Sequence, residues 1–227
     1  MALILLLETS TSVLSVALSR DGQCIASKVC TEPRMQASLT APYVKDLLDG
    51  EGIGIKDCDA VCVSMGPGSF TGLRVGVSTA KGLAFGAGIP LLATGTLDIL
   101  VRDAVDSGTD TQFIVPMIDA RRMEVYSAVF SPDGRQLTET APTIVDALSF
   151  APYLEKGKVL FTGDGAMKCR EVLQHPNAVF EERFPLARAM APLAEEAYKE
   201  KRFQDLAYFE PFYLKDFVAT VSRKKLF

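Results

Sequence analysis

The sequence predicts an α/β protein in which one order of strands and helices occurs twice. An apolar stretch typical of a buried strand ends at Glu8 in the first half and at Asp119 in the second. After each acid, at nearly the same distance, comes an Asp-Gly pair that is typical of a hairpin turn, Asp21-Gly22 and then Asp133-Gly134. Such self-similarity indicates a duplicated unit.

The first half contains five segments that predict strands, because they are short, apolar or alternating, and bounded by turn residues. They cover residues 3–8, 13–20, 23–30, 60–65 and 90–93. Three helices are predicted between and after them. These cover residues 35–48, which Pro42 should kink, residues 71–85, and a segment that Thr94 or Thr96 caps and that ends near residue 105.

The second half repeats the order. Strands are predicted over residues 113–119, 123–130, 135–140 and 159–161, and helices over 146–154, 165–174 and 186–199. We therefore expect two mixed sheets with helices on both faces, and a cleft between the two units. The first lobe is placed at residues 1–106 and a smaller second lobe, with a C-terminal tail from Pro211, at residues 107–227.

Composition indicates a folded protein and disfavours nucleic-acid binding by this chain alone. Of its 227 residues, 48% are hydrophobic and 23% charged, which is enough to build a core. The net charge is −4, and the one basic cluster is Arg223, Lys224 and Lys225 near the end. Since proteins that grip nucleic acid usually show a basic face, we expect contact with RNA to be indirect, through a partner. The alternatives for the basic cluster are a solvated terminus and a direct tRNA contact.

The apolar run from Ala2 to Leu7 is too short for a membrane span and has no basic segment before it, so we expect a cytoplasmic protein. The five cysteines include no CxxC pair and are expected to be free thiols. His175 is the single histidine, which excludes metal motifs that need two histidines. A Cys–His or Ser–His catalytic pair would have to use it.

Two loops are candidates for phosphate binding. The first contains Glu8, Thr9, Ser10 and Thr11, whose hydroxyls and amides could meet phosphate oxygens while Glu8 holds Mg²⁺ through water. Its counterpart in the second half carries Arg121 and Arg122, whose role stays open. The second loop contains Gly66, Gly68 and Ser69 before a helix, where an anion could sit, but it lacks the lysine of a Walker A loop. A tight structural turn explains it equally well.

A stripe of small residues, Gly72, Gly76 and Ala80, marks the helix over 71–85 and allows another element to approach closely. That element is either the chain's own sheet or a helix of a second subunit. With Leu73 and Val77 beside it, the stripe is one half of a candidate association surface. The other half is the apolar face of the preceding helix, formed by Met35, Leu39, Tyr43 and Leu47.

Three segments resemble the TsaB (YeaZ) family. Residues 5–11, LLLETST, are similar to its opening LxIDTST, with Glu8 where aspartate is usual. Residues 65–76, MGPGSFTGLRVG, resemble its GPGSFTGxRxG stretch, and residues 211–215, PFYLK, resemble its PxYLR. The likeness spans the chain and is strongest over residues 1–100.

This resemblance implies the duplicated fold of actin, sugar kinases and Hsp70. It implies a non-catalytic subunit, not an enzyme, that supports a TsaD-type catalytic subunit together with a TsaE-type ATPase. The complex places threonylcarbamoyl on the adenosine next to the anticodon of tRNAs that read codons starting with A. Alone, such chains form homodimers through the first two helices. No metal or required cofactor is implied, and Glu8 in place of aspartate leaves weak binding of ATP or ADP open.

Two other functions are weighed against the accessory subunit. An autonomous ATPase or small kinase of the same fold would bind ATP tightly through residues 9–12 and 66–68. A peptidase would need His175 as its base. The metal motif HxxxH of the catalytic paralogue is missing, because the corresponding helix begins Pro33-Arg34-Met35-Gln36-Ala37-Ser38-Leu39.

Overall fold

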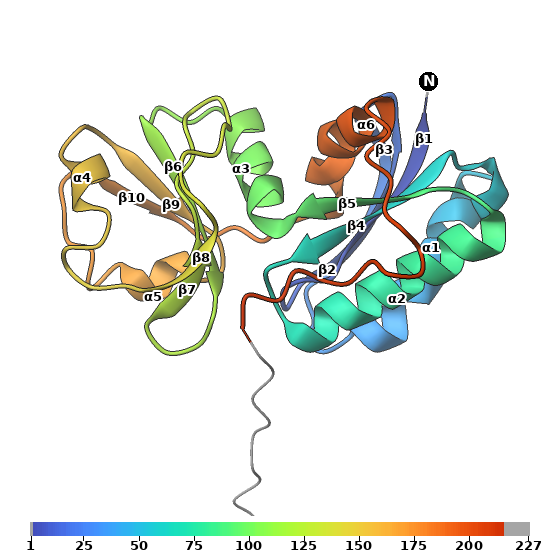
Figure 1. Cartoon of the computed structure of the whole chain (residues 1–227), viewed down its shortest axis with the longest axis horizontal. Helices are drawn as coiled ribbons and strands as arrows, with labels where there is room; N and C mark the ends of the chain where they lie inside the picture. The colour runs from blue at the N-terminus through green and yellow to red at the C-terminus, as the bar shows by residue number, and fades with distance from the viewer. Residues whose placement is uncertain (1, 216–227) are drawn as a thin grey trace, which may run out of the picture.

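The structure is a computed structural model that describes residues 2–215. It contains two lobes, each built on a five-stranded mixed sheet (Figure 1). The strand orders are β3-β2-β1-β4-β5 in the first lobe and β8-β7-β6-β9-β10 in the second, so each strand has a counterpart at the same place. The predicted duplication of one α/β unit is confirmed.

The first sheet follows the sequence prediction closely. Its strands are β1 (Leu3–Glu8), β2 (Leu14–Arg20), β3 (Gln23–Cys30), β4 (Ala60–Gly66) and β5 (Leu91–Gly95). The hairpin strands β1, β2 and β3 pair antiparallel, while β4 and β5 extend the sheet in parallel from β1. The parallel part is buried on both faces, which explains why these strands read as continuous apolar runs.

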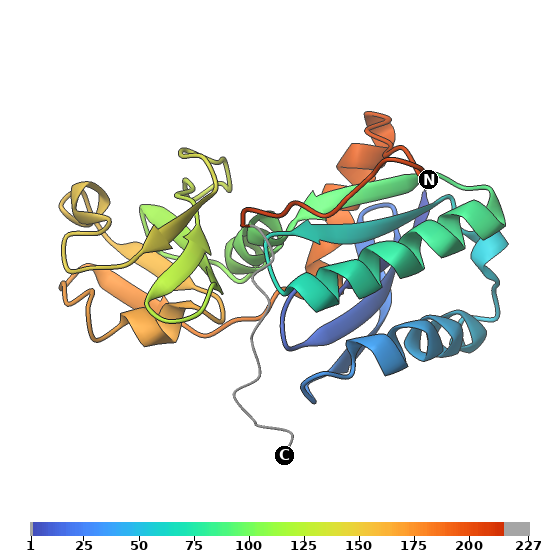
Figure 2. The ribbon, with the colours of Figure 1, turned by 60° about the horizontal axis from the view of Figure 1, so that its bottom comes forward.

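Helices cover both faces of the first sheet. On one face lie α1 (Gln36–Gly50), a 3₁₀ turn η1 (Ile55–Asp57) and α2 (Phe70–Ala87), side by side in Figure 2. On the other lie η2 (Ala187–Met190) and α6 (Ala191–Lys199). The helix α3 (Thr96–Asp106) begins after Gly95 with no side-chain cap, so the capping predicted for Thr94 or Thr96 is wrong.

The second sheet is smaller and departs more from prediction. Its strands are β6 (Phe113–Asp119), β7 (Glu124–Ser127), β8 (Ala141–Ile144), β9 (Val159–Thr162) and β10 (Ala178–Glu181). The third strand was predicted at 135–140 but lies just after it, and β10 was not predicted. Its helices α4 (Ala151–Leu154) and α5 (Ala166–Cys169) are short versions of the two predicted ones.

The chain returns to the first lobe after residue 183, which differs from the prediction that residues 107–227 form one unit. Helix α6 packs against the first sheet through a small apolar face that includes Ala191, Ala194 and Ala197. The Ser15 hydroxyl of β2 accepts a hydrogen bond from the Ala187 amide at 2.8 Å. From there, residues 200–215 run over the first lobe toward the second (Figure 1). None of the helices in residues 2–215 is long and apolar enough to span a bilayer.

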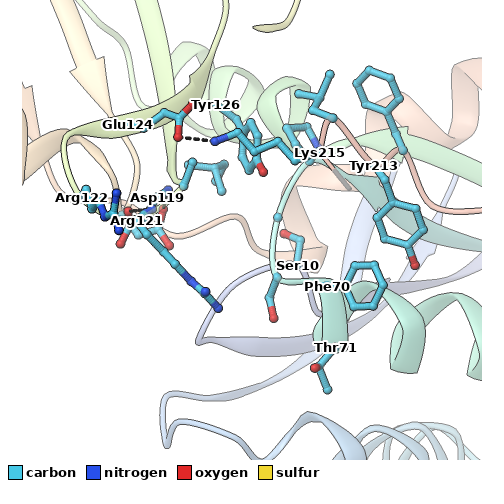
Figure 3. Close-up of a pocket in the computed structure, with 18 residues that line it drawn as sticks. Ser10, Phe70, Thr71, Asp119, Arg121, Arg122, Glu124, Tyr126, Tyr213 and Lys215 are labelled. Carbon is cyan, nitrogen blue, oxygen red and sulfur yellow. Dashed lines mark hydrogen bonds and ion pairs between the residues drawn. The ribbon is translucent and has the colours of Figure 1, made fainter. Parts of the chain in front are cut away.

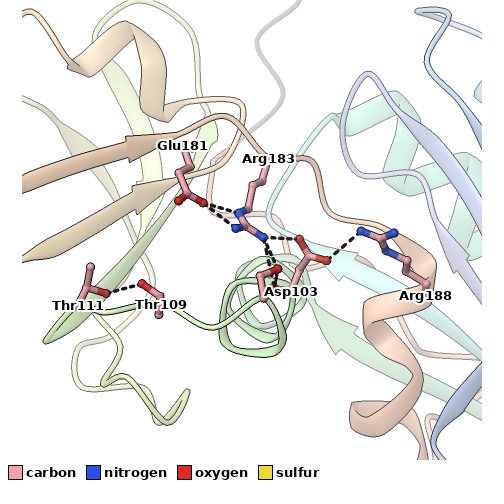
Figure 4. A network of polar contacts seen from close by, with 7 residues as sticks. Asp103, Thr109, Thr111, Glu181, Arg183 and Arg188 are labelled. Atoms are coloured by element: carbon pink, nitrogen blue, oxygen red, sulfur yellow. Dashed lines mark hydrogen bonds and ion pairs between the residues drawn. The ribbon is translucent and has the colours of Figure 1, made fainter.

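Ion pairs hold the place where the chain crosses between lobes (Figure 4). Arg183 lies between the lobes and pairs with Glu181 of β10 at 2.7 Å and with Asp103 of α3 at 2.9 Å. Asp103 also meets Arg188 of η2 at 3.3 Å. Helix α3 packs against the second sheet through Leu100, among others. This network therefore fixes one side of the molecule and leaves the cleft on the other.

Candidate functional site

A cleft of about 670 Å³ lies between the lobes, where β1, β4 and β6 end. The first lobe contributes Ser10 and residues 67–71 to its wall. The second lobe contributes residues 118–122 with Glu124, Tyr126 and Asp164, and the C-terminal segment adds residues 212–215 (Figure 3). This is the cleft that the duplicated sequence predicts.

The glycine-rich loop before α2 packs tightly against the turn after β1. The Ser69 amide donates to the Ser10 carbonyl at 2.6 Å, and the Ser69 hydroxyl accepts from the Gly72 amide at 3.2 Å, so Ser69 caps α2. A Cβ atom on Gly68 would lie closer than 3.0 Å to the Ser10 carbonyl oxygen. The loop therefore needs its glycine to admit the chain's own backbone, as the structural alternative predicts.

The small-residue stripe of α2 also faces inward. A Cβ atom on Gly72 or Gly76 would lie closer than 3.0 Å to the carbonyl or the hydroxyl oxygen of Thr9. The Thr9 hydroxyl donates to the Gly72 carbonyl at 2.8 Å. The assignment of this stripe and of the two side chains beside it to a partner surface is wrong, because all five residues are buried inside the first lobe. They are Gly72, Leu73, Gly76, Val77 and Ala80.

The first candidate phosphate loop is buried as well. Glu8, Thr9 and Ser10 are fully buried and Thr11 is 4% exposed. Glu8 accepts a hydrogen bond from the Ser10 amide at 2.5 Å, and the hydroxyls of Ser10 and Ser64 lie against its carboxyl group. Burial raises the pKa of Glu8 to about 7. Of the predicted phosphate-binding residues, the cleft wall includes Ser10, Gly68 and Ser69 but neither Glu8, Thr9, Thr11 nor Gly66.

The charges of the second-lobe wall are mostly paired. Asp119 forms an ion pair with Lys168 and accepts the Arg121 amide at 2.7 Å. Asp164 accepts the Asp119 amide at 2.9 Å, and burial raises the pKa of Asp164 to about 6. Arg121 and Arg122 line the cleft, and neither forms an ion pair with any residue from 2 to 215.

The remaining association residues are only partly available. On α1, Leu47 is buried against α2 and the sheet, whereas Met35, Leu39 and Tyr43 are half-buried at the surface. Near the end of α2, Phe85 has a side chain that is 80% exposed. Phe85 was not predicted from the sequence, although it follows Lys81 by four positions and lies outside the buried stripe.

The thiols and the histidine form no nucleophilic pair. Burial raises the pKa of Cys62 to about 12 and that of Cys58 to about 11, the opposite of what activates a thiol. His175 Nδ1 accepts the Asn177 amide at 3.1 Å in the loop before β10. Among the residues described, no three His, Cys, Asp or Glu side chains gather as metal ligands.

Comparisons with known proteins agree with this fold. The family model for TsaD, tRNA N6-adenosine threonylcarbamoyltransferase, matches residues 34–222. The TsaB protein of Escherichia coli, named for tRNA threonylcarbamoyladenosine biosynthesis, is 31% identical over 95% of this chain and 96% of its own length. The structure of YeaZ from Pseudomonas aeruginosa superposes with a TM-score of 0.83 at 30% identity, over 94% of this chain and 100% of that one.

A more distant structure shows the same fold. The activator of 2-hydroxyisocaproyl-CoA dehydratase from Clostridium difficile superposes with a TM-score of 0.51 at 10% identity, over 88% of this chain and 97% of that one. The two lobes thus have the duplicated actin-like fold. By sequence, topology and the GPGSFTG loop that ties α2 to β1, the chain belongs to the TsaB (YeaZ) family.

Proposed function

We propose that this chain takes part in the synthesis of threonylcarbamoyladenosine in tRNA as a non-catalytic subunit that binds a TsaD-type catalytic subunit. The full-length similarity to TsaB proteins supports the pathway. The observation that supports the accessory role is the burial of residues 8–11 and the packing of the glycine loop onto them. The polar groups of these two loops contact each other inside the first lobe. Few of them are therefore left to hold a reacting nucleotide and a metal ion.

The outward face of α1 and α2 is the proposed partner surface. It carries half-buried Met35 and Leu39 near the start of α1 and exposed Phe85 near the end of α2, on two helices that pack together. Aromatic side chains are enriched in the buried cores of protein–protein interfaces. Without its partner, the chain is proposed to cover this face by forming a homodimer, and a TsaE-type ATPase would join the complex with the partner.

Light scattering on a sizing column tests the association, with the chain alone and mixed with the TsaD-type subunit of the same organism. We expect a homodimer alone and a stable complex in the mixture. Phe85→Asp should abolish the complex, because it buries a charge in an apolar contact. Ile144→Asp is the matched control, since Ile144 is 73% exposed on the second lobe, and it should bind normally.

Transfer of threonylcarbamoyl to tRNA tests the accessory role. The mixture with TsaD-type and TsaE-type subunits should modify tRNA, and the chain alone should not. Modification by the chain alone, or a mixture that is equally active without it, would contradict the proposal.

A further inference from the structure

We propose that residues 204–215 form a strap that limits how far the two lobes can open, and that Lys81 of α2 is the residue that positions this strap. The strap begins on β5 of the first lobe, passes beside α2 and ends on the second lobe (Figure 1). Apart from a single bridge between Gln204 and Leu91, it contains no strand or helix. A segment with so few backbone hydrogen bonds opens easily unless side chains hold it.

A turn that begins at Asp205 presents two carbonyl groups of the strap to Lys81. The Asp205 carboxylate accepts the amides of Ala207 at 2.7 Å and Tyr208 at 3.2 Å. The Phe209 amide closes the turn by donating to the Asp205 carbonyl at 2.8 Å. The Lys81 ammonium then donates to the Ala207 carbonyl at 3.3 Å and to the Phe209 carbonyl at 3.1 Å. The turn therefore offers a cation two oxygens that converge on α2.

The charge of Lys81 is used for these carbonyl groups. Helix α2 carries two charged residues, Arg74 and Lys81, and Lys81 forms no ion pair with any residue from 2 to 215. Its side chain is half-buried, and Leu206 and Phe209 pack into the apolar core under α2. Hydrogen bonds from a charged donor are about twice as strong as neutral ones. Lys81 is therefore the strongest polar anchor of the strap on the first lobe.

The far end of the strap joins the lobes through weaker contacts. The Phe212 amide donates to the Met65 carbonyl at 2.7 Å, and Lys215 forms an exposed ion pair with Glu124 of β7. The last four residues of the strap line the cleft. Because exposed ion pairs contribute little, the position of this end depends on the anchor at Lys81. The ion pairs of Figure 4 join the lobes on the other side, so the strap is a second crossing that limits their rotation.

Hydrogen exchange of the full chain tests the strap. Lys81→Met keeps the apolar stem of the side chain and removes the ammonium. Amide exchange at residues 205–215 should be at least about tenfold faster in this variant than in the parent, because local opening becomes easier. Exchange should also be faster at residues 118–122, the facing wall of the cleft, and small-angle X-ray scattering should show a larger radius of gyration. The matched control Lys45→Met, at an exposed lysine that pairs with Asp49 of α1, should change neither readout.

Variants at both partners separate the loss of the anchor from a general loss of stability. Lys81→Arg keeps the cation, so its exchange should stay close to that of the parent. Asp205→Ala opens the turn from the other side and should reproduce Lys81→Met, whereas Asp205→Asn keeps an acceptor oxygen and should not. Urea unfolding checks that each variant is folded, and Asp205→Ala carries the test if Lys81→Met does not fold.

Two results would overturn the proposal. Exchange at residues 205–215 as slow in Lys81→Met as in the parent would show that Lys81 does not position the strap. Faster exchange there, with the radius of gyration and exchange at residues 118–122 unchanged, would show that the strap does not limit the opening of the lobes. These measurements use the chain alone, so they do not depend on its association with a TsaD-type subunit.

Discussion

Lys215 forms an ion pair with Glu124 and thereby joins the C-terminal segment of the chain to the second lobe. The same segment is fixed to the first lobe one step earlier, where the Phe212 amide donates to the Met65 carbonyl at 2.7 Å. Tyr213 contacts Phe70 at the start of α2. Residues 212–215 thus bridge the lobes on the side opposite the Arg183 network.

Breaking this ion pair should loosen the bridge at little cost to the whole fold. The side chains are 39% and 23% exposed, so we expect Lys215→Glu to lower the free energy of unfolding by about 1 kcal/mol or less. The double variant with Glu124→Lys should recover most of that loss. Hydrogen exchange at residues 212–215 reports directly on the mobility of this segment. If exchange is as slow in Lys215→Glu as in the parent, the ion pair with Glu124 does not hold the segment in place.

Replacing two glycines of α2 in turn distinguishes the effect of internal packing on stability from the effect of helix propensity. Gly76→Ala should destabilise the protein by about 2–4 kcal/mol, because its Cβ would overlap the Thr9 hydroxyl in a buried site. Gly82 lies in the same helix with no atom within 4 Å of an added Cβ. Gly82→Ala should therefore stabilise the protein by about 0.5–1 kcal/mol.

Urea unfolding of both glycine variants measures the difference. If Gly76→Ala were as stable as the parent, the close approach of Thr9 to α2 would be wrong. The stripe would then be free to meet a partner, as the sequence alone allowed.

The strands of the first lobe were predictable because burial on both faces leaves an unmistakable apolar run, as in residues 3–8 and 60–66. In the second lobe the signals are weaker. Strand β8 (Ala141–Ile144) lies at a sheet edge with exposed side chains, and β10 (Ala178–Glu181) has four residues after a proline-containing loop. Neither has a periodicity long enough to detect.

The existence of the cleft could be predicted from the sequence, but most of the side chains that line it could not. The sequence identified Ser10, Gly68 and Ser69, and it noted Arg121 and Arg122 without a role. It could not show that Thr9 turns inward onto Gly72 and Gly76, since that depends on how α2 crosses the end of β1. The same lack of tertiary information placed residues 187–199 in the wrong lobe. The basic cluster at 223–225 lies outside the described residues.

Glu8 should make stability depend on pH. Its pKa in the folded protein is raised to about 7 by burial, against 4.5 ordinarily, so the folded state binds the proton more strongly than the unfolded state. Stability contributed by this group should therefore fall as pH rises from 4.5 to 7 and stay low above that. Glu8→Gln keeps an oxygen for the Ser10 amide and removes the charge.

We expect Glu8→Gln to be more stable than the parent at pH 8, by about 2–3 kcal/mol, and to differ little from it at pH 5. Urea unfolding at the two pH values measures this, and taking the difference between the two proteins cancels the titration of other carboxyls such as Asp164. A constant difference at both pH values would show that Glu8 is not the group responsible.

The loop that carries the two arginines is expected to be strained. Arg121 and Arg122 have φ angles of 72° and 52°, the left-handed region in which side chains other than glycine cost about 1 kcal/mol each. They lie with Met123 in the loop between β6 and β7, which the Ala120 amide closes by donating to the Glu124 carbonyl at 3.1 Å. Replacing both with glycine should raise the free energy of unfolding by up to about 1–2 kcal/mol while removing the cationic side chains from the cleft. Urea unfolding of the double variant and the parent measures this difference. A variant less stable than the parent would show instead that the arginine side chains hold the turn together.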